Sequence, residues 1–389
     1  MATASIITPF FPLNIEHKRT RVEALTFFRF VAALIVVFFH YGRETALATW
    51  GKPLTLSGPQ MVTFFFVLSG FVMLIAHYQK DNEKLRDYYI SRIARIAPVY
   101  FLALGGIILL TKKSDMKALL LSSTFLQAWV SPYPQTLNTP GWSLSVEMFF
   151  YLTFPLLLFL IRRYNIKTLS FGLVALSLYI GSQVVLSKLM VPPFYKGYPS
   201  FSHDIVYYFP LSHYCSFLLG MAGGLLYIRN KPFFSSQGIR SYAILVGGVV
   251  TTYYLLQYPG ILRKTIGYPL AYCSSFYAVV FTGFILALSF SRNYIAKGLS
   301  FPALIFLGEI SYCLYILQYP AHIIYYRYIS PLLHLKGQTH FYIYLSFLII
   351  LSSIIYLFFE KPLNNLFSKI KSSTTKRNQA HSTEQVTAH

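Results

Sequence analysis

Long apolar runs alternate with short polar stretches along the whole chain. A helix needs roughly 20 apolar residues to cross the hydrocarbon core of a bilayer, and ten runs come close to that length. The pattern predicts an all-α integral membrane protein, a bundle of about ten transmembrane helices. The predicted spans lie at about 25–47, 59–78, 96–111, 142–161, 168–189, 205–228, 239–257, 267–290, 301–325 and 341–359.

An eleventh apolar run, Met116–Trp129, is too short to cross a bilayer. Its length of about 14 residues is typical of a re-entrant or interfacial segment. Parity also favours leaving it out, because basic residues mark the cytoplasmic side and both ends of the chain are basic. Ten crossings place both termini in the cytoplasm. The lysines at 112, 113 and 117 then lie outside, so the topology of 112–141 stays open.

The predicted domain organisation follows from these spans. Residues 1–23 form a cytoplasmic N-terminal tail, 24–362 form the membrane domain, and 363–389 form a basic, partly disordered cytoplasmic tail. The longest outer loop, at about 190–204, is rich in Pro and Tyr, and such a loop can cover a binding site. No separate soluble domain is predicted.

The composition agrees with a membrane protein and explains the charge. Of the 389 residues, 55% are hydrophobic and 12% are charged, against about 25% charged residues in soluble domains. Lys and Arg number 33 against 12 Asp and Glu, an excess that can indicate nucleic acid or an anionic membrane surface. Most of these basic residues flank apolar runs, as topology signals do. We therefore expect a lipid bilayer, and no nucleic acid, as partner.

Disulfides and metal sites are not indicated. The three cysteines, Cys215, Cys273 and Cys313, all lie inside apolar segments and are predicted to be packing residues. The chain has no His/Cys cluster with zinc-type spacing, no phosphate loop and no dinucleotide fingerprint. We expect no metal and no permanently bound cofactor.

The residues most costly to place in a membrane are Arg29 and His40, at the two ends of one apolar run. In a helix, eleven residues give about 16 Å of rise and a rotation within about 20° of three turns, so both side chains share one face. Lipid offers neither group a partner, and such residues normally point into a bundle or a wet cavity. Arg29 is expected near the cytoplasmic side and His40 deeper, as a candidate functional pair.

Arg92 and Arg95 follow the second span and share a helix face at the expected cytoplasmic mouth. Two neighbouring guanidinium groups suit the planar, bidentate capture of phosphate oxygens. Soluble cosubstrates with several phosphates include coenzyme A and nucleotides. The alternative is a positive-inside anchor that binds lipid headgroups.

Ser143, Glu147 and Tyr151 are spaced by four residues and share a face of the span that begins near 142. A carboxylate in a buried helix needs a partner, and His40 is the obvious candidate, because a carboxylate can orient an imidazole. In the alternative interpretation, Ser143 caps the helix and Glu147 forms a structural ion pair.

Polar residues in other spans have simpler interpretations. Ser69 and Gly70 lie in the middle of a span, where small residues usually mean close helix packing. Ser311 and Tyr312 share a span with further polar residues, which indicates a cavity lining, although tyrosines are also ordinary at membrane edges. Glu360 is expected to fix the end of the last span.

Five short motifs give the chain a resemblance to a known family. They occur at 28–40 (FRFVAALIVVFFH), 65–71 (FFVLSGF), 92–100 (RIARIAPVY), 142–147 (WSLSVE) and 310–315 (ISYCLY). In this order, over about residues 24 to 362, they resemble the acyltransferase-three membrane family. The resemblance implies an enzyme that moves an acyl group, commonly acetyl, from cytoplasmic acyl-coenzyme A to a hydroxyl of an extracytoplasmic sugar. The acceptor is expected to be a surface or lipid-linked glycan, such as lipopolysaccharide O-antigen, and the location a bacterial inner membrane.

The resemblance also implies roles for individual residues. His40, Glu147 and Ser143 map onto catalytic positions, and Arg29, Arg92 and Arg95 onto positions that bind the acyl donor. Trp142, Tyr151, Ser311 and Tyr312 are expected to bind substrate. Many members have a histidine where this chain has Gln318, so no proton-transfer role is assigned there. No fused esterase-like domain is expected, and the chain resembles stand-alone transferases.

The expected reaction leaves two routes open at His40. The neutral imidazole acts as general base on the sugar hydroxyl, or it first takes the acyl group itself. Glu147 is expected to orient it. The alternative function is that of a glycolipid or polysaccharide transporter, which a bundle of ten helices could also form. The chain lacks the paired broken helices that usually mark a transporter site.

Overall fold

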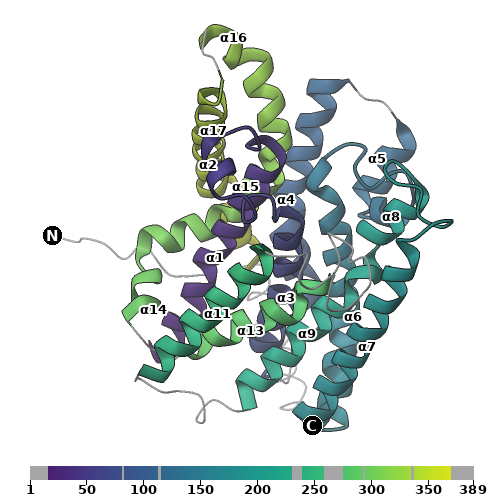
Figure 1. The fold of residues 1–389 in the computed structure, drawn as a ribbon, viewed down its shortest axis with the longest axis vertical. Coiled ribbons are helices and arrows are strands. Elements are labelled where there is room, and N and C mark those ends of the chain that lie inside the picture. Colours follow the sequence, from purple (N-terminus) through teal and green to yellow (C-terminus); the bar gives the residue numbers. More distant parts are fainter. Residues whose placement is uncertain are drawn as a thin grey trace, which may run out of the picture.

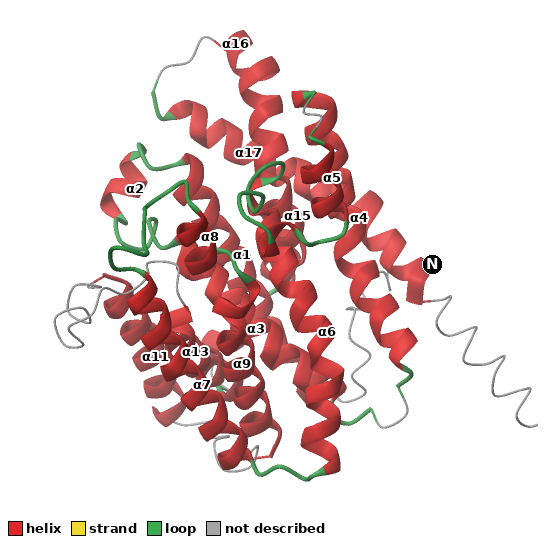
Figure 2. Ribbon diagram, turned by 90° about the vertical axis from the view of Figure 1, so that its right-hand side faces the viewer, coloured by secondary structure: helices red, strands yellow, loops and turns green. Residues whose placement is uncertain are grey.

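The computed structural model describes residues 16–80, 83–112, 115–229, 239–257, 275–291, 294–333 and 337–368. These residues form helices, turns and loops, and no strand occurs within these ranges. Long helices run roughly along the longest axis of the molecule (Figure 1), and the short helices α2, α5 and α16 lie towards one end of it (Figure 2). The all-α prediction is confirmed.

The helices follow one another along the chain with short connections. The α-helices are α1 (Glu16–Tyr41), α2 (Ala46–Trp50), α3 (Gly58–His77), α4 (Leu85–Thr111), α5 (Met116–Ser123), α6 (Trp142–Arg163), α7 (Thr168–Leu189), α8 (Phe201–Tyr207), α9 (Pro210–Arg229), α11 (Ile239–Gln257), α13 (Ala278–Phe290), α14 (Tyr294–Leu299), α15 (Pro302–Ile324), α16 (Ser330–Leu333) and α17 (Thr339–Ile355). The 3₁₀-helices are η1 (Gln127–Trp129), η2 (Thr139–Gly141) and η3 (Ser275–Tyr277), and the π-helical turns are η4 (Tyr325–Ile329) and η5 (Tyr356–Glu360).

Within the described ranges, eight helices are long and apolar enough to cross a membrane. They confirm eight of the ten predicted spans. The other two predicted spans, 239–257 and 267–290, correspond to shorter apolar helices at Tyr242–Leu256 and Ser275–Phe290. The eight long helices are Ala24–Tyr41, Gly58–His77, Leu85–Thr111, Thr139–Arg163, Thr168–Leu189, Phe201–Arg229, Pro302–Leu333 and Thr339–Ser368.

Both ends of the predicted membrane domain extend further as helix than expected. Helix α1 begins at Glu16, and the last helix continues through Ser368, beyond the predicted boundary at 362. Parts of several predictions lie outside the described residues. These are the tails at 1–15 and 369–389, the start of the span at 267–274, Lys113 and Cys273.

The segment 116–129 does not cross the bundle. Helix α5 has eight residues, and the Asp115 carboxylate caps it by accepting hydrogen bonds from the backbone N–H groups of Lys117 and Ala118, at 3.0 and 3.1 Å. The chain then turns through η1. A helix of this length spans only about 12 Å, less than half of a bilayer core, in line with the expected short segment.

Small residues allow the central helices to approach closely. A Cβ atom built on Gly70 of α3 would lie 2.1 Å from the carbonyl oxygen of Phe217 in α9. Built on Gly220 of α9, it would lie 2.0 Å from the carbonyl oxygen of Val67. Gly308 of α15 is equally close to the carbonyl oxygen of Thr26 in α1. The packing role expected for Gly70 is therefore confirmed, and α3 lies at the centre of the bundle.

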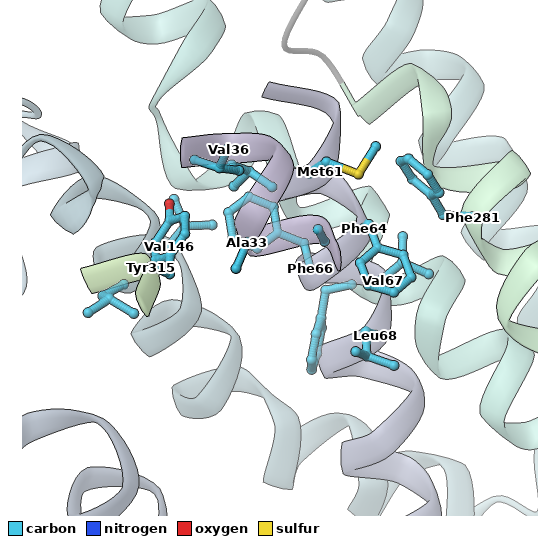
Figure 3. Packing of buried hydrophobic residues seen from close by; sticks show 14 of the residues in the cluster. Ala33, Val36, Met61, Phe64, Phe66, Val67, Leu68, Val146, Phe281 and Tyr315 are labelled. Carbon is cyan, nitrogen blue, oxygen red and sulfur yellow. The ribbon is translucent and has the colours of Figure 1, made fainter. Parts of the chain in front are cut away.

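The core around α3 is rich in aromatic and branched side chains. Phe64, Phe66 and Val67 are buried among Ala33 of α1 and Phe281 of α13 (Figure 3). The free cysteines Cys215 and Cys313 are also buried, as their apolar context predicts. Helix α7, in contrast, has many exposed large apolar side chains, as expected of a helix that faces lipid; they include Leu173, Val174, Ile180, Val184 and Val185.

Candidate functional site

A cavity of about 990 Å³ lies among α1, α3, α4, α6, α15 and the helical segment that ends at Ser368. We call it the central cavity. Its size is at the upper end of the range for small-molecule sites. It begins at the end of the bundle where α3 connects to α4, with Lys80 and Ser368 in its wall, and it extends inward to Ser143 and Tyr315. The long helices place polar groups from distant parts of the sequence around this one space.

The central cavity brings together eight of the ten residues predicted for the site. Two predicted residues, His40 and Trp142, do not line it. The eight that do are Arg29, Arg92, Arg95, Ser143, Glu147, Tyr151, Ser311 and Tyr312.

The three arginines supply positive charge to the cavity wall, and two of them are left without a close partner. Arg29 and Arg95 are partly buried, and neither forms a hydrogen bond or an ion pair with another described residue. Arg92 donates to Met73 Sδ at 3.2 Å and lies 5.8 Å from the ring centre of Tyr151. A guanidinium group without a carboxylate partner is suited to an anionic ligand.

Two carboxylates partly balance this charge from a greater distance. Glu147 and Glu360 interact electrostatically with Arg29, and Glu360 also with Arg95. Glu360 is buried beside the cavity, and its carboxylate accepts a hydrogen bond from Cys313 Sγ at 3.0 Å. The sequence predicts only that Glu360 fixes the end of the last span. In the structure its charge also faces the arginines of the site.

Glu147 belongs to a hydrogen-bonded network inside the cavity wall. Tyr151 Oη donates to Glu147 Oε1 at 2.6 Å, one helical turn away on α6, and Ser69 Oγ of α3 donates to the same oxygen at 3.4 Å. Tyr88 of α4 donates to the carbonyl oxygen of Tyr151 at 2.9 Å, which fixes α6 against α4. The predicted face of Glu147 and Tyr151 is correct. Ser69 is predicted only as a packing residue, and its sequence context carries no sign of this contact.

The deep end of the cavity holds a pair of hydroxyl groups. Ser143 Oγ donates to the carbonyl oxygen of Pro140 at 2.9 Å and lies 2.8 Å from Tyr315 Oη. Tyr315 Oη also lies 3.4 Å from the carbonyl oxygen of Pro140, so one hydroxyl donates to that carbonyl while the other donates to its partner hydroxyl. Figure 3 shows Tyr315 among buried residues from α1 and α6. Gly141 occupies the N-cap position of α6 and no side chain caps the helix, so the alternative role of Ser143 as a cap is wrong.

Ser311 and Tyr312 line the cavity from α15, in agreement with the predicted cavity lining. Both direct their hydroxyl protons to the backbone. Ser311 Oγ donates to the carbonyl oxygen of Gly308 at 2.6 Å, and Tyr312 Oη donates to that of Ile96 in α4, also at 2.6 Å. Their oxygen atoms remain available as hydrogen-bond acceptors for a ligand.

Trp142 packs within an aromatic cluster beside the cavity. Its ring centre lies 5.1 Å from that of Tyr208, 5.4 Å from that of His213 and 6.1 Å from that of Phe66. The side chain is buried. Trp142 therefore supports the start of α6 and does not line the cavity, and its role in substrate binding stays a prediction.

His40 lies at the last turn of α1, eleven residues beyond Arg29, and is exposed. Its ring is next to those of its neighbours Phe39 and Tyr41, and Tyr41 stacks on His322 of α15 at 4.4 Å. His40 makes no hydrogen bond to any residue in the described ranges. The predicted pair of His40 with Glu147 is thus not formed, and the catalytic role of His40 stays a prediction.

The last helix contributes polar groups that the sequence does not indicate. Asn364, Asn365 and Ser368 line the cavity, although the prediction assigns them to a cytoplasmic tail. Across the mouth, His77 contacts the Glu83 carboxylate, which also lies 3.8 Å from Lys80. Within the described residues, no group of three or more side chains is arranged to hold a metal ion.

Comparison with known proteins relates the chain to a family. A family model described as "Acyltransferase domain" matches residues 22–357. "Acyltransferase MdmB" of Streptomyces mycarofaciens is 34% identical over 166 residues, which cover 38% of this chain and 42% of the relative. "Putative O-acetyltransferase SACOL0978" of Staphylococcus aureus (strain COL) is 26% identical over 383 residues, which cover 89% of this chain and 58% of the relative. The chain thus spans about half the length of these relatives. No solved structure gives a significant match.

Proposed function

The chain belongs to the acyltransferase family whose model spans residues 22–357, and from this premise we propose that it is a membrane O-acyltransferase. The proposed donor is acyl-coenzyme A, with acetyl as the acyl group. The proposed acceptor is a hydroxyl of a surface or lipid-linked glycan, such as lipopolysaccharide O-antigen, outside the bacterial inner membrane. A relative of similar sequence over most of this chain is named an O-acetyltransferase, which supports the choice of group.

The observation that carries the proposal is the pair of unpartnered arginines in the central cavity. Arg29 and Arg95 present positive charge inside a membrane bundle with no carboxylate within ion-pair distance among the described residues. Such charge is costly in a membrane unless a ligand or a functional role compensates it. A donor with several phosphates supplies that compensation, and the cavity is large enough for a flexible arm to extend inward from them.

The reaction requires a base for the attacking hydroxyl. In the direct route, neutral His40 takes the proton of the glycan hydroxyl while its oxygen attacks the thioester carbonyl carbon. The C–S bond then breaks, and the leaving thiolate recovers the proton from His40. In the covalent route, the His40 nitrogen attacks first, the thiol leaves, and the acyl-imidazole passes the acyl group to the hydroxyl.

Both routes require the thioester to move beyond the deep end of the cavity, because His40 does not line it. Ser143 and Tyr315 line that deep end, and the proposed path of the thioester to His40 leads past their hydroxyl pair. Glu147 acts in this proposal as a positioning residue, which holds Tyr151 against the Arg92 guanidinium group.

Mass spectrometry of surface glycan from cells with and without the gene tests the proposed reaction. Loss of acetyl transfer lowers the glycan mass by about 42 Da per modified site, as expected when an ester is no longer formed. Glycan of unchanged mass that accumulates on the wrong side of the membrane would instead support a transporter.

Binding of acetyl-coenzyme A to the purified protein tests the donor site. The double variant Arg92→Ala, Arg95→Ala loses hydrogen bonds between charged groups, which are worth about 1.5–3 kcal/mol each, so affinity falls at least about tenfold. Arg86→Ala is the matched control, because Arg86 is exposed at the start of the same helix and does not line the cavity. Equal affinity in the double variant and the control contradicts the phosphate site.

A further inference from the structure

The last helix presents a second polar surface to the central cavity, one turn beyond Glu360. Glu360 and Asn364 are four residues apart and share a face, with Phe367 three residues further on. Asn364 and Phe367 both line the cavity. One helical turn rises about 5.4 Å, so Asn364 lies nearer the mouth than Glu360, whose charge faces Arg95 and Arg29.

Asn364 is buried and has no partner. Only 9% of its surface is exposed, and its side-chain amide makes no hydrogen bond to any residue that the structure describes. Its amide atoms keep some accessible surface and face the cavity, so a ligand there can complete their hydrogen bonds. An amide offers a donor and an acceptor side by side, which selects a ligand with the opposite pair.

Phe367 supplies an aromatic face on the same side of the helix. It is partly buried and lines the cavity beside Asn364. An aromatic ring and an asparagine amide together are the elements that recognise adenine, because the ring stacks on the base and the amide pairs with its amino group and N7. Stacking alone would accept any base, and the amide adds selectivity for the amino group.

The order of chemical groups in the proposed donor places adenine at this position. The phosphates connect the nucleoside to the arm that carries the thioester. If the phosphates bind at Arg92 and Arg95 and the thioester extends inward to Ser143, the base must lie on the mouth side of the arginines. Asn364 and Phe367 lie about one and two helical turns nearer the mouth than Glu360, which interacts with Arg95, whereas amide groups of the arm would lie deeper.

We propose that Asn364 and Phe367 form a subsite for the adenine base of the acyl donor. The base stacks on the Phe367 ring, and its amino edge pairs with the Asn364 amide. The proposal rests on the proposed use of acyl-coenzyme A, and it assigns a recognition role to a segment that continues the last membrane helix.

Binding to the full-length protein in lipid nanodiscs tests the subsite with two probes. Coenzyme A carries the base, and 4′-phosphopantetheine lacks it. Asn364→Ala weakens coenzyme A binding by about 5- to 100-fold, the value of a bidentate asparagine–adenine pair, and leaves 4′-phosphopantetheine binding unchanged. Phe367→Ala gives the same pattern through the loss of stacking. Leu366→Ala is the control, because Leu366 is exposed on the same helix and does not line the cavity.

A third probe, coenzyme A with hypoxanthine in place of adenine, tests the amino group directly. The wild-type protein binds the adenine form more tightly than the hypoxanthine form. Asn364→Ala removes that preference, even if the substitution also alters stability. Equal losses of affinity for coenzyme A and 4′-phosphopantetheine would overturn the proposal, because Asn364 would then contact the pantetheine arm and not the base. Unchanged binding of both probes would also overturn it. If the unchanged protein binds neither probe, the proposed donor itself is wrong.

Discussion

The two ends of the polar face of α1 lie in different surroundings. Arg29 lies in the wall of the central cavity, where it interacts with two carboxylates and with Arg95. His40 lies eleven residues further along, exposed, with aromatic side chains as its neighbours. A shared helix face therefore does not give the two residues a shared site.

This difference indicates that the proposed donor site is more fully formed than the surroundings of His40, where transfer to the acceptor is proposed. The donor site is built in advance, because hydrogen bonds of Tyr88 and Tyr312 hold α6 and α15 against α4. Tyr151 donates to Glu147 within α6. His40 does not line the central cavity. The acceptor, a large glycan in our proposal, needs an open approach, and an exposed His40 provides one.

Replacing His40 should have the largest effect and should separate the two ends. His40→Ala removes the proposed base or nucleophile, which lowers the transfer rate by about 10²- to 10⁴-fold. Binding of acetyl-coenzyme A should stay unchanged, because His40 does not line the cavity. Transfer is measured on surface glycan by mass spectrometry and donor binding by calorimetry.

His203→Ala serves as the matched histidine control. His203 stacks on Tyr207 at 4.4 Å and lies outside the central cavity. Its substitution should leave both transfer and donor binding near the values of the unchanged protein. A His40→Ala protein that still acetylates at the normal rate would remove His40 from the mechanism.

Glu147→Gln tests whether the Glu147 carboxylate acts on the donor site near Arg29 or on His40. The structure connects Glu147 to Tyr151 and Ser69, so the substitution should loosen Tyr151 and the Arg92 group beside it. Hydrogen bonds to a charged group are worth about 1.5–3 kcal/mol, and we expect the KM for the donor to rise about tenfold. The pH dependence of kcat should keep its position.

Tyr151→Phe removes only the hydroxyl and should reproduce part of that rise in KM. The competing hypothesis, in which Glu147 orients His40, makes a different prediction. It leaves the donor KM unchanged and moves the acid side of the kcat profile to lower pH, because the imidazolium loses a stabilising negative charge. Either pattern decides the assignment.

Glu360→Gln should have a smaller effect of opposite sign. Glu360 places negative charge opposite Arg95 and Arg29, so its neutralisation should strengthen the binding of an anionic donor by about fivefold, as expected for a partly screened charge. Calorimetry at two salt concentrations measures the change. Cys313→Ala is the control, since it removes the hydrogen bond to Glu360 and keeps the charge. Weaker donor binding in Glu360→Gln would contradict an anionic ligand beside these arginines.

The sequence predicts the membrane helices and the faces of single helices well, for a physical reason. Lipid requires long apolar segments, so hydropathy alone locates eight of the spans. The spacing of four residues fixes Glu147 and Tyr151 on one face of α6, and the structure brings them into contact. A charge in an apolar run is costly, which is why the sequence alone singles out Arg29. The spacing of three residues singles out Arg92 and Arg95.

Contacts between helices are not determined by such periodicity. The rotation of each helix about its axis depends on how all neighbouring side chains pack, so periodicity does not predict Ser69 as a partner of Glu147 or Tyr315 as a partner of Ser143. Trp142 is assigned to substrate by its motif, yet aromatic packing holds it beside the cavity. Asn364 follows a charged stretch that resembles a tail, and the continued last helix brings it into the cavity wall.

Tyr315→Phe tests the deep end of the cavity, between the two ends of α1. The substitution removes the hydroxyl that is hydrogen-bonded to Ser143, while Ser143 keeps its bond to the carbonyl oxygen of Pro140. A neutral hydrogen bond contributes about 0.5–1.5 kcal/mol, so we expect about a threefold fall in kcat, near the lower end of that range, with unchanged donor affinity. Ser143→Ala should reach the same kcat, because both variants break the same pair. If Tyr315→Phe lowers the melting temperature and leaves kcat unchanged, the hydroxyl pair only joins α6 to α15, and the path of the thioester towards His40 lies elsewhere.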